Sequence, residues 1–276
     1  METWEIPGEG VGGGRPDPSS RAAARRGRPG PEAAGAVLLA GMVVAQVVSG
    51  LHSGDLRLVG AVVVLLAAAA LAFAAAARSA SRAGAAFGAA FAVGYAAEWA
   101  GVRTGLPFGD YRYTDALWPR PGGVPVVVAL AWSGMGLAAH AVGRRVAPGS
   151  RAARVALGAV ALTAWDLFLD PQMTRLGLWV WADPGPYRGV PLGNFAGWLL
   201  VSALVVLAID VLMGAPGGTG ADRGSTGLVV LYTVMAVMET IGFAAVFRPP
   251  DPLVAAVGGA AMGALALLAW RRRWRR

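Results

Sequence analysis

Two aspartates four residues apart give this sequence its first candidate for chemistry. Asp166 and Asp170 lie in the stretch DLFLDP, in an apolar segment that runs into Pro171. On a helix, residues four apart share a face, about 5–6 Å from each other. Two carboxyl groups that close titrate as a pair, so one is expected to hold a proton. A protonated carboxylic acid beside an apolar cavity can donate a proton to a carbon–carbon double bond.

The deeper aspartate of the pair is the expected proton donor. Asp166 lies one turn further from the helix end, and therefore further from water, than Asp170, which is expected to stay ionised. A purely structural alternative remains open. In that case Asp170 ends a helix before Pro171 and Asp166 pairs with an arginine.

Two glutamates lie inside other apolar segments. Ionisable groups within a membrane span are costly, so they usually face a cavity or a partner. Glu98, about one turn from the end of its segment, could serve as a general acid or base or orient a water molecule. Its structural alternative is an ion pair with Arg103 or Arg175. Glu239 lies about 12 Å inside its segment, where it could face substrate or pair with an arginine or asparagine.

Aromatic side chains and one amide lie close to these acids in the sequence. Aromatic faces stabilise positive charge, including that of a carbocation. In an extended segment Tyr111 and Tyr113 would lie on one side, either lining a pocket or belonging to an interfacial aromatic belt. We expect the acids to converge on one apolar-walled cavity near the outer membrane boundary. The expected substrate-binding residues are Asn194, Glu239, Tyr111, Tyr113, Trp165, Trp179, Trp181, Tyr187 and Trp198.

Apolar segments must position these residues. Of the 276 residues, 56% are hydrophobic and 14% charged, and several apolar runs approach the roughly 20 residues that cross a bilayer. The sequence predicts an all-α fold, a polytopic transmembrane helix bundle of about eight spans. They are placed at 33–51, 57–77, 83–101, 124–142, 154–171, 195–213, 226–247 and 252–270. Span 154–171 is the weakest, being short and carrying two acids, and seven spans remain without it.

The same pattern divides the chain into one domain and two tails. Residues 33–270 form the integral membrane domain. Residues 1–32 are a tail rich in Gly, Pro and Arg, which is predicted to be disordered. Residues 271–276 form a basic C-terminal tail.

The distribution of charge predicts how the bundle lies in its membrane, expected to be a bacterial cytoplasmic membrane. All 24 basic residues are arginine, and the formal net charge is +8. With both termini in the cytoplasm, 17 arginines lie on the cytoplasmic side and seven on the other, in line with the positive-inside rule. Topology and anionic lipid headgroups explain these clusters better than nucleic acid does. The long connections 102–123 and 172–194 then share the outer side.

Several kinds of site are excluded by the residue types. The chain has no cysteine, so thiolate catalysis and disulfides are excluded. Its two histidines, His52 and His140, are far apart and form no metal-binding motif, so no metal site is expected. A nucleotide-binding loop, a serine-nucleophile elbow and a DDxxD diphosphate motif are also missing from the sequence. None of these motifs therefore indicates a reaction other than acid-catalysed chemistry on an alkene.

Taken together, the motifs resemble a known family from about Ala33 to the last span. They are EWAGVRTGLPFGDYRY (98–113), GVPVVVALAW (123–132), DLFLDP (166–171) and WVWADPGPYRGVPLGNFAGW (179–198). The chain is similar to the membrane carotenoid biosynthesis proteins that include carotenoid 1′,2′-hydratases and bisanhydrobacterioruberin hydratases. The resemblance implies water addition to the terminal isopropylidene double bond of an acyclic carotenoid, giving a tertiary alcohol, without a redox cofactor. It supplies no catalytic residues, so the site rests on the physical argument.

A mechanism follows from these expectations. Asp166 or Asp170 protonates the terminal alkene, and Glu98, or Asn194 with the other aspartate, positions the water and takes its proton. The expected partners are the acyclic carotenoid, water and membrane lipids, with other carotenoid biosynthesis enzymes as further candidates, and no nucleic acid. Alternatives are a carotenoid cyclase or isomerase, which would exclude water, and a non-catalytic carotenoid or lipid carrier. A proton-coupled transporter is weaker, because the acids do not form a path to the cytoplasmic side.

Overall fold

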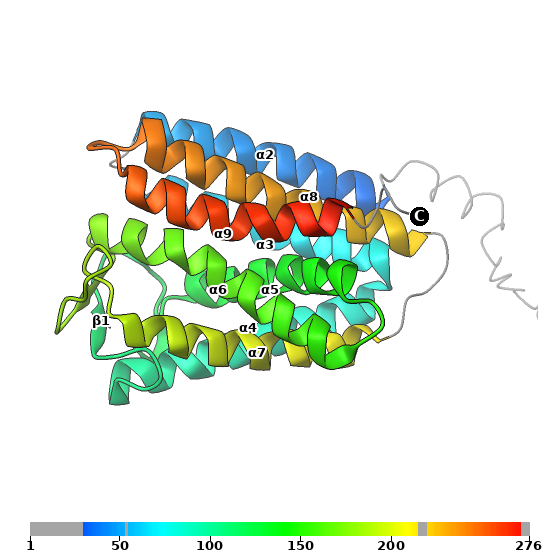
Figure 1. The fold of residues 1–276 in the computed structure, drawn as a ribbon, viewed down its shortest axis with the longest axis horizontal. Helices are drawn as coiled ribbons and strands as arrows, with labels where there is room; N and C mark the ends of the chain where they lie inside the picture. Colours follow the sequence, from blue (N-terminus) through cyan, green and yellow to red (C-terminus); the bar gives the residue numbers. More distant parts are fainter. Residues whose placement is uncertain (1–29, 53–54, 215–219, 272–276) are drawn as a thin grey trace, which may run out of the picture. The chain divides into compact units, whose positions relative to one another are not determined.

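The helices of the bundle follow the predicted apolar segments. The computed structural model describes residues 30–52, 55–214 and 220–271. Within these residues it has eight long helices (Figure 1): α2 (Pro31–Leu51), α3 (Leu56–Ala77), α4 (Ala80–Thr104), α5 (Val126–Val146), α6 (Arg151–Arg175), α7 (Leu192–Met213), α8 (Gly220–Ile241) and α9 (Pro252–Arg271). The all-α helix-bundle class is confirmed. Most of the predicted N-terminal tail and all but Arg271 of the C-terminal tail lie outside the described residues.

Seven of the described helices are long and apolar enough to cross a membrane. The segment predicted to be weakest lies in α6, which runs for 25 residues and is among the seven. The helix that falls short is α4, although it also has 25 residues. Its alanines are interrupted by glycines, by four aromatic residues and by Glu98. This helix depends on neighbouring helices to cover its polar residue.

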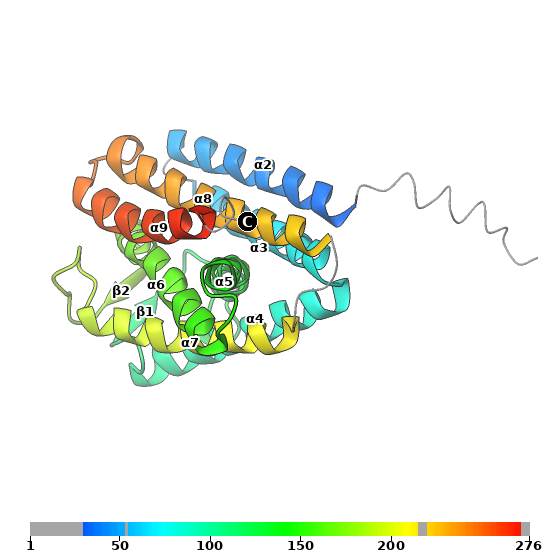
Figure 2. The ribbon, with the colours of Figure 1, turned by 45° about the vertical axis from the view of Figure 1, so that its right-hand side comes forward.

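Helix α5 lies at the centre of the bundle, and Figure 2 shows it nearly end-on with the other helices around it. Nearly every residue from Val128 to Gly143 is buried. Small residues bring its neighbours close, as is usual between membrane helices. A Cβ added to Gly143 would lie 2.2 Å from the backbone oxygen of Arg154 on α6, and one added to Gly94 of α4 would lie 2.6 Å from the ring of Trp132. These approaches hold α4 and α6 against the same central helix.

One end of the bundle, here called the strand end, carries a short two-stranded sheet (Figure 1). Strand β1 (Tyr111–Tyr113) pairs antiparallel with β2 (Trp179–Trp181), with Tyr111 opposite Trp181 and Tyr113 opposite Trp179. Side chains alternate along a strand, and here the four aromatic residues are buried while the central residue of each strand is exposed. The two long connections, predicted to lie on one side, therefore pair with each other. A 3-10 turn, η1 (Pro121–Gly123), precedes α5.

The helix with the two aspartates does not end at its proline. The structural alternative, in which Asp170 ends a helix before Pro171, is wrong, because α6 continues through Pro171 to Arg175. A proline lacks the N–H that would bond to the carbonyl four residues earlier. That carbonyl, of Leu167, accepts a hydrogen bond of 3.0 Å from the hydroxyl of Tyr187 instead. The strand-end connection thus supplies the missing donor.

The last two helices meet at the strand end through a wider turn of helix. Helix α8 runs into η2 (Gly242–Val246), a π-helical turn, before α9 begins. Asp251 stands at the start of α9, where its side chain accepts a hydrogen bond from the Val254 N–H, and its carboxylate pairs with Arg188 of the β2–α7 connection. Burial raises the pKa of the Asp251 carboxyl, but hydrogen bonds from Arg188 and the Val254 N–H outweigh it and hold that pKa below its usual value.

Candidate active site

Asn194 joins the two aspartates of α6. It lies in the first turn of α7, and its side-chain NH₂ donates to Oδ2 of Asp166 at 2.9 Å and to Oδ2 of Asp170. All three side chains are buried, Asp166 being 0% and Asp170 3% exposed. Oδ1 of Asp166 has no hydrogen-bond partner among the described residues. Two negative charges on one amide in an apolar setting would repel strongly, so this geometry favours one shared proton.

Glu98 is held by three donors from other parts of the chain. The hydroxyl of Tyr111 and that of Tyr113, the latter at 2.7 Å, both donate to Oε2. The indole N–H of Trp132 on α5 donates to Oε1 at 3.0 Å. Three donors and no basic partner suit an ionised carboxylate acting as an acceptor.

The structural alternative for Glu98, an ion pair with Arg103 or Arg175, is not formed. Arg103 stacks on the ring of Trp99 and donates to backbone oxygens, and Arg175 donates to the backbone oxygen of Pro249. Both arginines are exposed at the strand end, where water solvates them. Glu98 faces the bundle interior, where neutral O–H and N–H donors satisfy it without burying a second charge.

Strand β1 places the two tyrosines that hold Glu98. Tyr111 and Tyr113 flank the exposed Arg112, so their rings lie on the same face of the strand. Burial, and then the charge of Glu98, raises the pKa of both phenols. Both hydroxyls therefore stay protonated and remain donors near neutral pH. The expectation that an extended segment would turn both rings to one side is confirmed, and they point into the protein.

A small cavity separates the Glu98 group from the aspartate pair. Its volume is about 20 Å³, which is enough for one water molecule. Its walls include the polar side chains of Glu98, Asp170 and Asn194, whereas Asp166 does not line it. The remaining walls are Phe108, Tyr111, Tyr113, Val128, Leu169, Trp179, Trp181 and Trp198. Asp170 is therefore the aspartate that can reach a molecule in this cavity.

Stacked indoles support one side of the cavity. The rings of Trp132 and Trp198 stack with centroids 4.1 Å apart, and Trp165 meets Trp198 edge-on at 6.4 Å. Trp132 and Phe108 are absent from the sequence-based prediction. An indole in an apolar helix resembles a core residue, and the only available signal for Trp132 was its place at the end of the GVPVVVALAW motif.

Other predicted site residues lie away from the cavity. Tyr187 is partly buried and bonds to α6, and Trp165 packs behind Trp198. Glu239 is buried on α8 but does not line the cavity. None of the described residues forms an ion pair or hydrogen bond with it. The structure thus brings together Glu98, Asp166, Asp170 and Asn194, and leaves Glu239 outside.

Comparisons with known proteins agree with the resemblance seen in the motifs. A family profile described as "Carotenoid biosynthesis protein" matches residues 59–265. A segment of 116 residues is 37% identical to a protein of Haloarcula japonica named bisanhydrobacterioruberin hydratase. This segment covers 40% of the chain and 39% of that relative, so less than half of each protein is aligned. No solved structure is significantly similar to the chain.

Proposed function

Since the chain belongs to the carotenoid biosynthesis protein family, we propose that it adds water to the terminal isopropylidene double bond of an acyclic carotenoid. The observation that carries this proposal is the water-sized cavity between Asp170 and Glu98. The cavity places the Asp170 carboxyl group, which can donate a proton, opposite the Glu98 carboxylate, which can accept one. The named hydratase among the relatives supports the same reaction.

The first step is protonation of the alkene. The O–H bond of Asp170 breaks, and its proton adds to the CH carbon of the double bond. The positive charge then develops on the carbon that bears the two methyl groups. Asp166 shares the Asn194 amide with Asp170 but does not line the cavity, so it is a positioning residue that keeps one proton in the pair.

The second step is capture of the cation by water. The water oxygen forms a bond to the tertiary carbon, and one of its protons passes to Glu98, which is held ready by three donors. Glu98 later returns this proton to Asp170, so the reaction consumes only water. The negative charge of Glu98 and the faces of the surrounding indoles stabilise the cation before it is captured.

The substrate end needs more room than the cavity offers. Four carbons of an isopropylidene end exceed the space of one water molecule. The aromatic residues of β1 and β2 form the part of the cavity wall that lies outside the helices. These short strands would therefore have to move to admit the substrate end. The long polyene would lie along the apolar helices, with lipid around it.

The test uses a host that makes an acyclic carotenoid. Expression of the chain should convert the pigment to a product heavier by one water, carrying a tertiary alcohol. An unchanged mass with a shifted absorption spectrum would indicate a cyclase or isomerase instead. Unchanged pigment, with the protein present in the membrane, would leave a carrier role and overturn the hydratase.

A further inference from the structure

A large cavity opens at the other end of the bundle, here called the arginine end. Its volume is about 1350 Å³, above the usual range of roughly 300–1,000 Å³ for small-molecule pockets. It is bounded by the ends of α2, α3, α5, α6, α7 and α8. Nothing in the proposed hydration uses it, because that reaction lies at the strand end.

Basic side chains dominate the polar part of this cavity. Five arginines line it, against two carboxylates, Asp210 and Glu32. The arginines are Arg78, Arg144, Arg145, Arg151 and Arg154. Among these lining residues the arginines thus outnumber the carboxylates.

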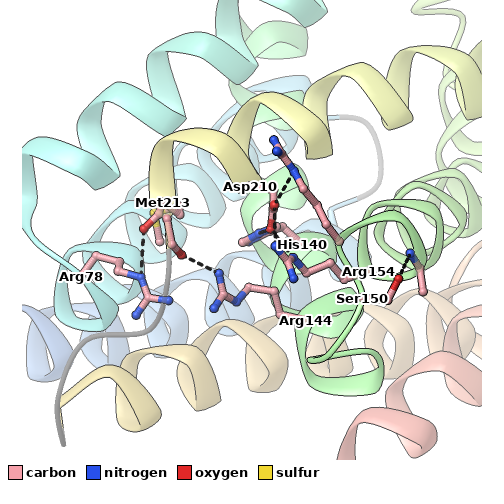
Figure 3. A network of polar contacts seen from close by, with 10 residues as sticks. Arg78, His140, Arg144, Ser150, Arg154, Asp210 and Met213 are labelled. Carbon is pink, nitrogen blue, oxygen red and sulfur yellow. Dashed lines mark hydrogen bonds and ion pairs between the residues drawn. The ribbon is translucent and has the colours of Figure 1, made fainter.

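Asp210 is already fully engaged by its neighbours, as Figure 3 shows. Arg154 holds it with two hydrogen bonds, of 2.7 and 3.0 Å, and Arg151 lies 3.3 Å from it. The ring of His140 makes a further contact of 3.1 Å. The carboxylate is buried under these groups, and its ion pairs with arginines of the described residues are those with Arg151 and Arg154, not with Arg78 or Arg144.

Arg78 and Arg144 are oriented by neutral partners. Arg78 donates to the backbone oxygen of Met213 at 3.1 Å, and Arg144 donates to that of Gly214 at 2.8 Å (Figure 3). Both guanidinium groups thus converge on the end of α7. Burial, and then repulsion from Arg144 and Arg82, lowers the pKa of Arg78. A bound anion would relieve this repulsion, and the planar fork of arginine suits a phosphate.

Apart from His140, Ser225 and Thr226, most of the other residues that line the cavity are apolar. Leu39 and Val43 of α2 line it together with Val230 and Val234 of α8. A phosphate ion would fill only a small part of this space. An anion that also has a long hydrocarbon tail would contact both the arginines and the apolar wall.

We propose that this cavity binds an anionic glycerophospholipid, with its phosphate between Arg78 and Arg144 and an acyl chain along α2 and α8. The position agrees with the predicted cytoplasmic side, because basic pockets between membrane helices on that side bind anionic headgroups. The proposal is independent of the hydration reaction. A free phosphate shares the headgroup chemistry, so the test separates the two sources.

The test compares ligands on the full chain, purified in an uncharged detergent. Phosphatidylglycerol should raise the thermal unfolding midpoint by several degrees, while phosphatidylcholine and inorganic phosphate should not. An equal rise with phosphatidylcholine would overturn the anion site. An equal rise with inorganic phosphate would overturn the lipid as its source.

Variants then locate the site. The double variant Arg78→Gln/Arg144→Gln should bind phosphatidylglycerol at least about tenfold more weakly, since each charge-assisted hydrogen bond is worth about that factor. The control Arg112→Gln/Arg248→Gln removes the same charge from exposed arginines at the strand end and should bind as the unaltered chain does. Equal weakening in both would overturn the site in favour of general electrostatic attraction.

A third variant tests the apolar wall without touching any arginine. Ala40→Phe adds a ring to the α2 wall and should also weaken phosphatidylglycerol binding. Full binding by Ala40→Phe would overturn the placement of the acyl chain. If the arginine double variant does not fold, this variant and the three ligands still decide the proposal.

Discussion

Asp170 and Asp166 differ in one respect that separates their roles. Asp170 lines the cavity, whereas Asp166 does not, although both accept a hydrogen bond from Asn194. The expectation that the deeper Asp166 donates the proton rested on distance from water alone. It is untested, and the geometry favours Asp170, because a donor must contact the carbon that it protonates.

The first prediction concerns this pair. Asp170→Asn should lower hydration about 10²–10⁴-fold, the usual contribution of a positioned acid, with the protein still folded. Asp166→Asn should reduce activity less, through loss of the shared proton. Hydroxylated carotenoid is measured at equal membrane levels of protein, with the exposed Asp183→Asn as a control. Full activity in Asp170→Asn, with loss only in Asp166→Asn, would reverse the two roles.

The second prediction concerns the donors to Glu98. Tyr113→Phe removes a buried bond of 2.7 Å to this carboxylate and should lower the free energy of unfolding by about 1.5–3 kcal/mol. Tyr95→Phe is the matched control, because its hydroxyl donates to a backbone oxygen near the surface and its loss should cost about 0.5–1.5 kcal/mol. Thermal unfolding in detergent measures both. A smaller loss in Tyr113→Phe than in the control would contradict an ionised Glu98.

At this scale the sequence predicted that the acids would lie together better than it predicted what they contact. The four-residue spacing of Asp166 and Asp170 was enough to place them on one face. The partners of Glu98 could not be predicted, because Tyr111 and Tyr113 reach it only through the register of β1 on β2. That pairing joins parts of the chain more than sixty residues apart.

At the scale of elements, the joint between α6 and the β2–α7 connection provides the third prediction. Tyr187 donates to the Leu167 oxygen that Pro171 leaves without a donor. Burial, with the charge of Asp251, raises the pKa of Tyr187 to about 12, so its hydroxyl keeps its proton near neutral pH. Tyr187→Phe should therefore destabilise the protein by about 1 kcal/mol.

A double-mutant cycle isolates this contact. In a Pro171→Ala background the new backbone N–H can donate to Leu167, so Tyr187→Phe should cost clearly less there. Thermal unfolding of the four proteins gives the coupling. Equal costs in both backgrounds would mean that the tyrosine acts only through packing on Phe195, whose ring it meets edge-on.

The positions of the helices could be predicted from the lengths of the apolar runs. The continuation of α6 through Pro171 and the pairing of the two strands could not. Proline usually marks a helix end, so the continuation of α6 to Arg175 depends on a donor from a distant loop. The strands are three residues long, too short for any periodic pattern. Alternation around Arg112 was the one usable hint, and it indicated the direction of both rings correctly.

At the scale of the whole molecule, the fourth prediction is topological. The arginine bias predicts both termini on the cytoplasmic side. Reporter fusions at each terminus should give the cytoplasmic signal, and a fusion in the β2–α7 connection at Asp183 should give the opposite one. Termini on opposite faces would show that one of the eight helices does not cross the membrane. Helix α4 would be the first candidate, because it is not among the seven helices that are apolar enough to cross.

The fold class could be predicted because the number of apolar runs determines a bundle, whereas the site depends on how those runs pack. Close approaches at Gly94 and Gly143 bring α4 and α6 onto α5, and only this packing sets Glu98 opposite Asp170. Abundant Ala and Gly made such approaches possible along many helix faces. The sequence alone could not indicate which faces would meet.

The dependence of Glu98 on Tyr111, Tyr113 and Trp132 has a consequence for biosynthesis. All three donors follow Glu98 in the chain. Helix α4 is therefore synthesised before any of these hydrogen-bond donors to its carboxylate. We expect α4 to enter the lipid as a hairpin with α5 rather than alone. In a translocon insertion assay α4 by itself should insert poorly, Glu98→Gln should improve it, and the α4–α5 pair should insert well. Efficient insertion of α4 alone would show that its carboxylate does not need these donors for membrane insertion.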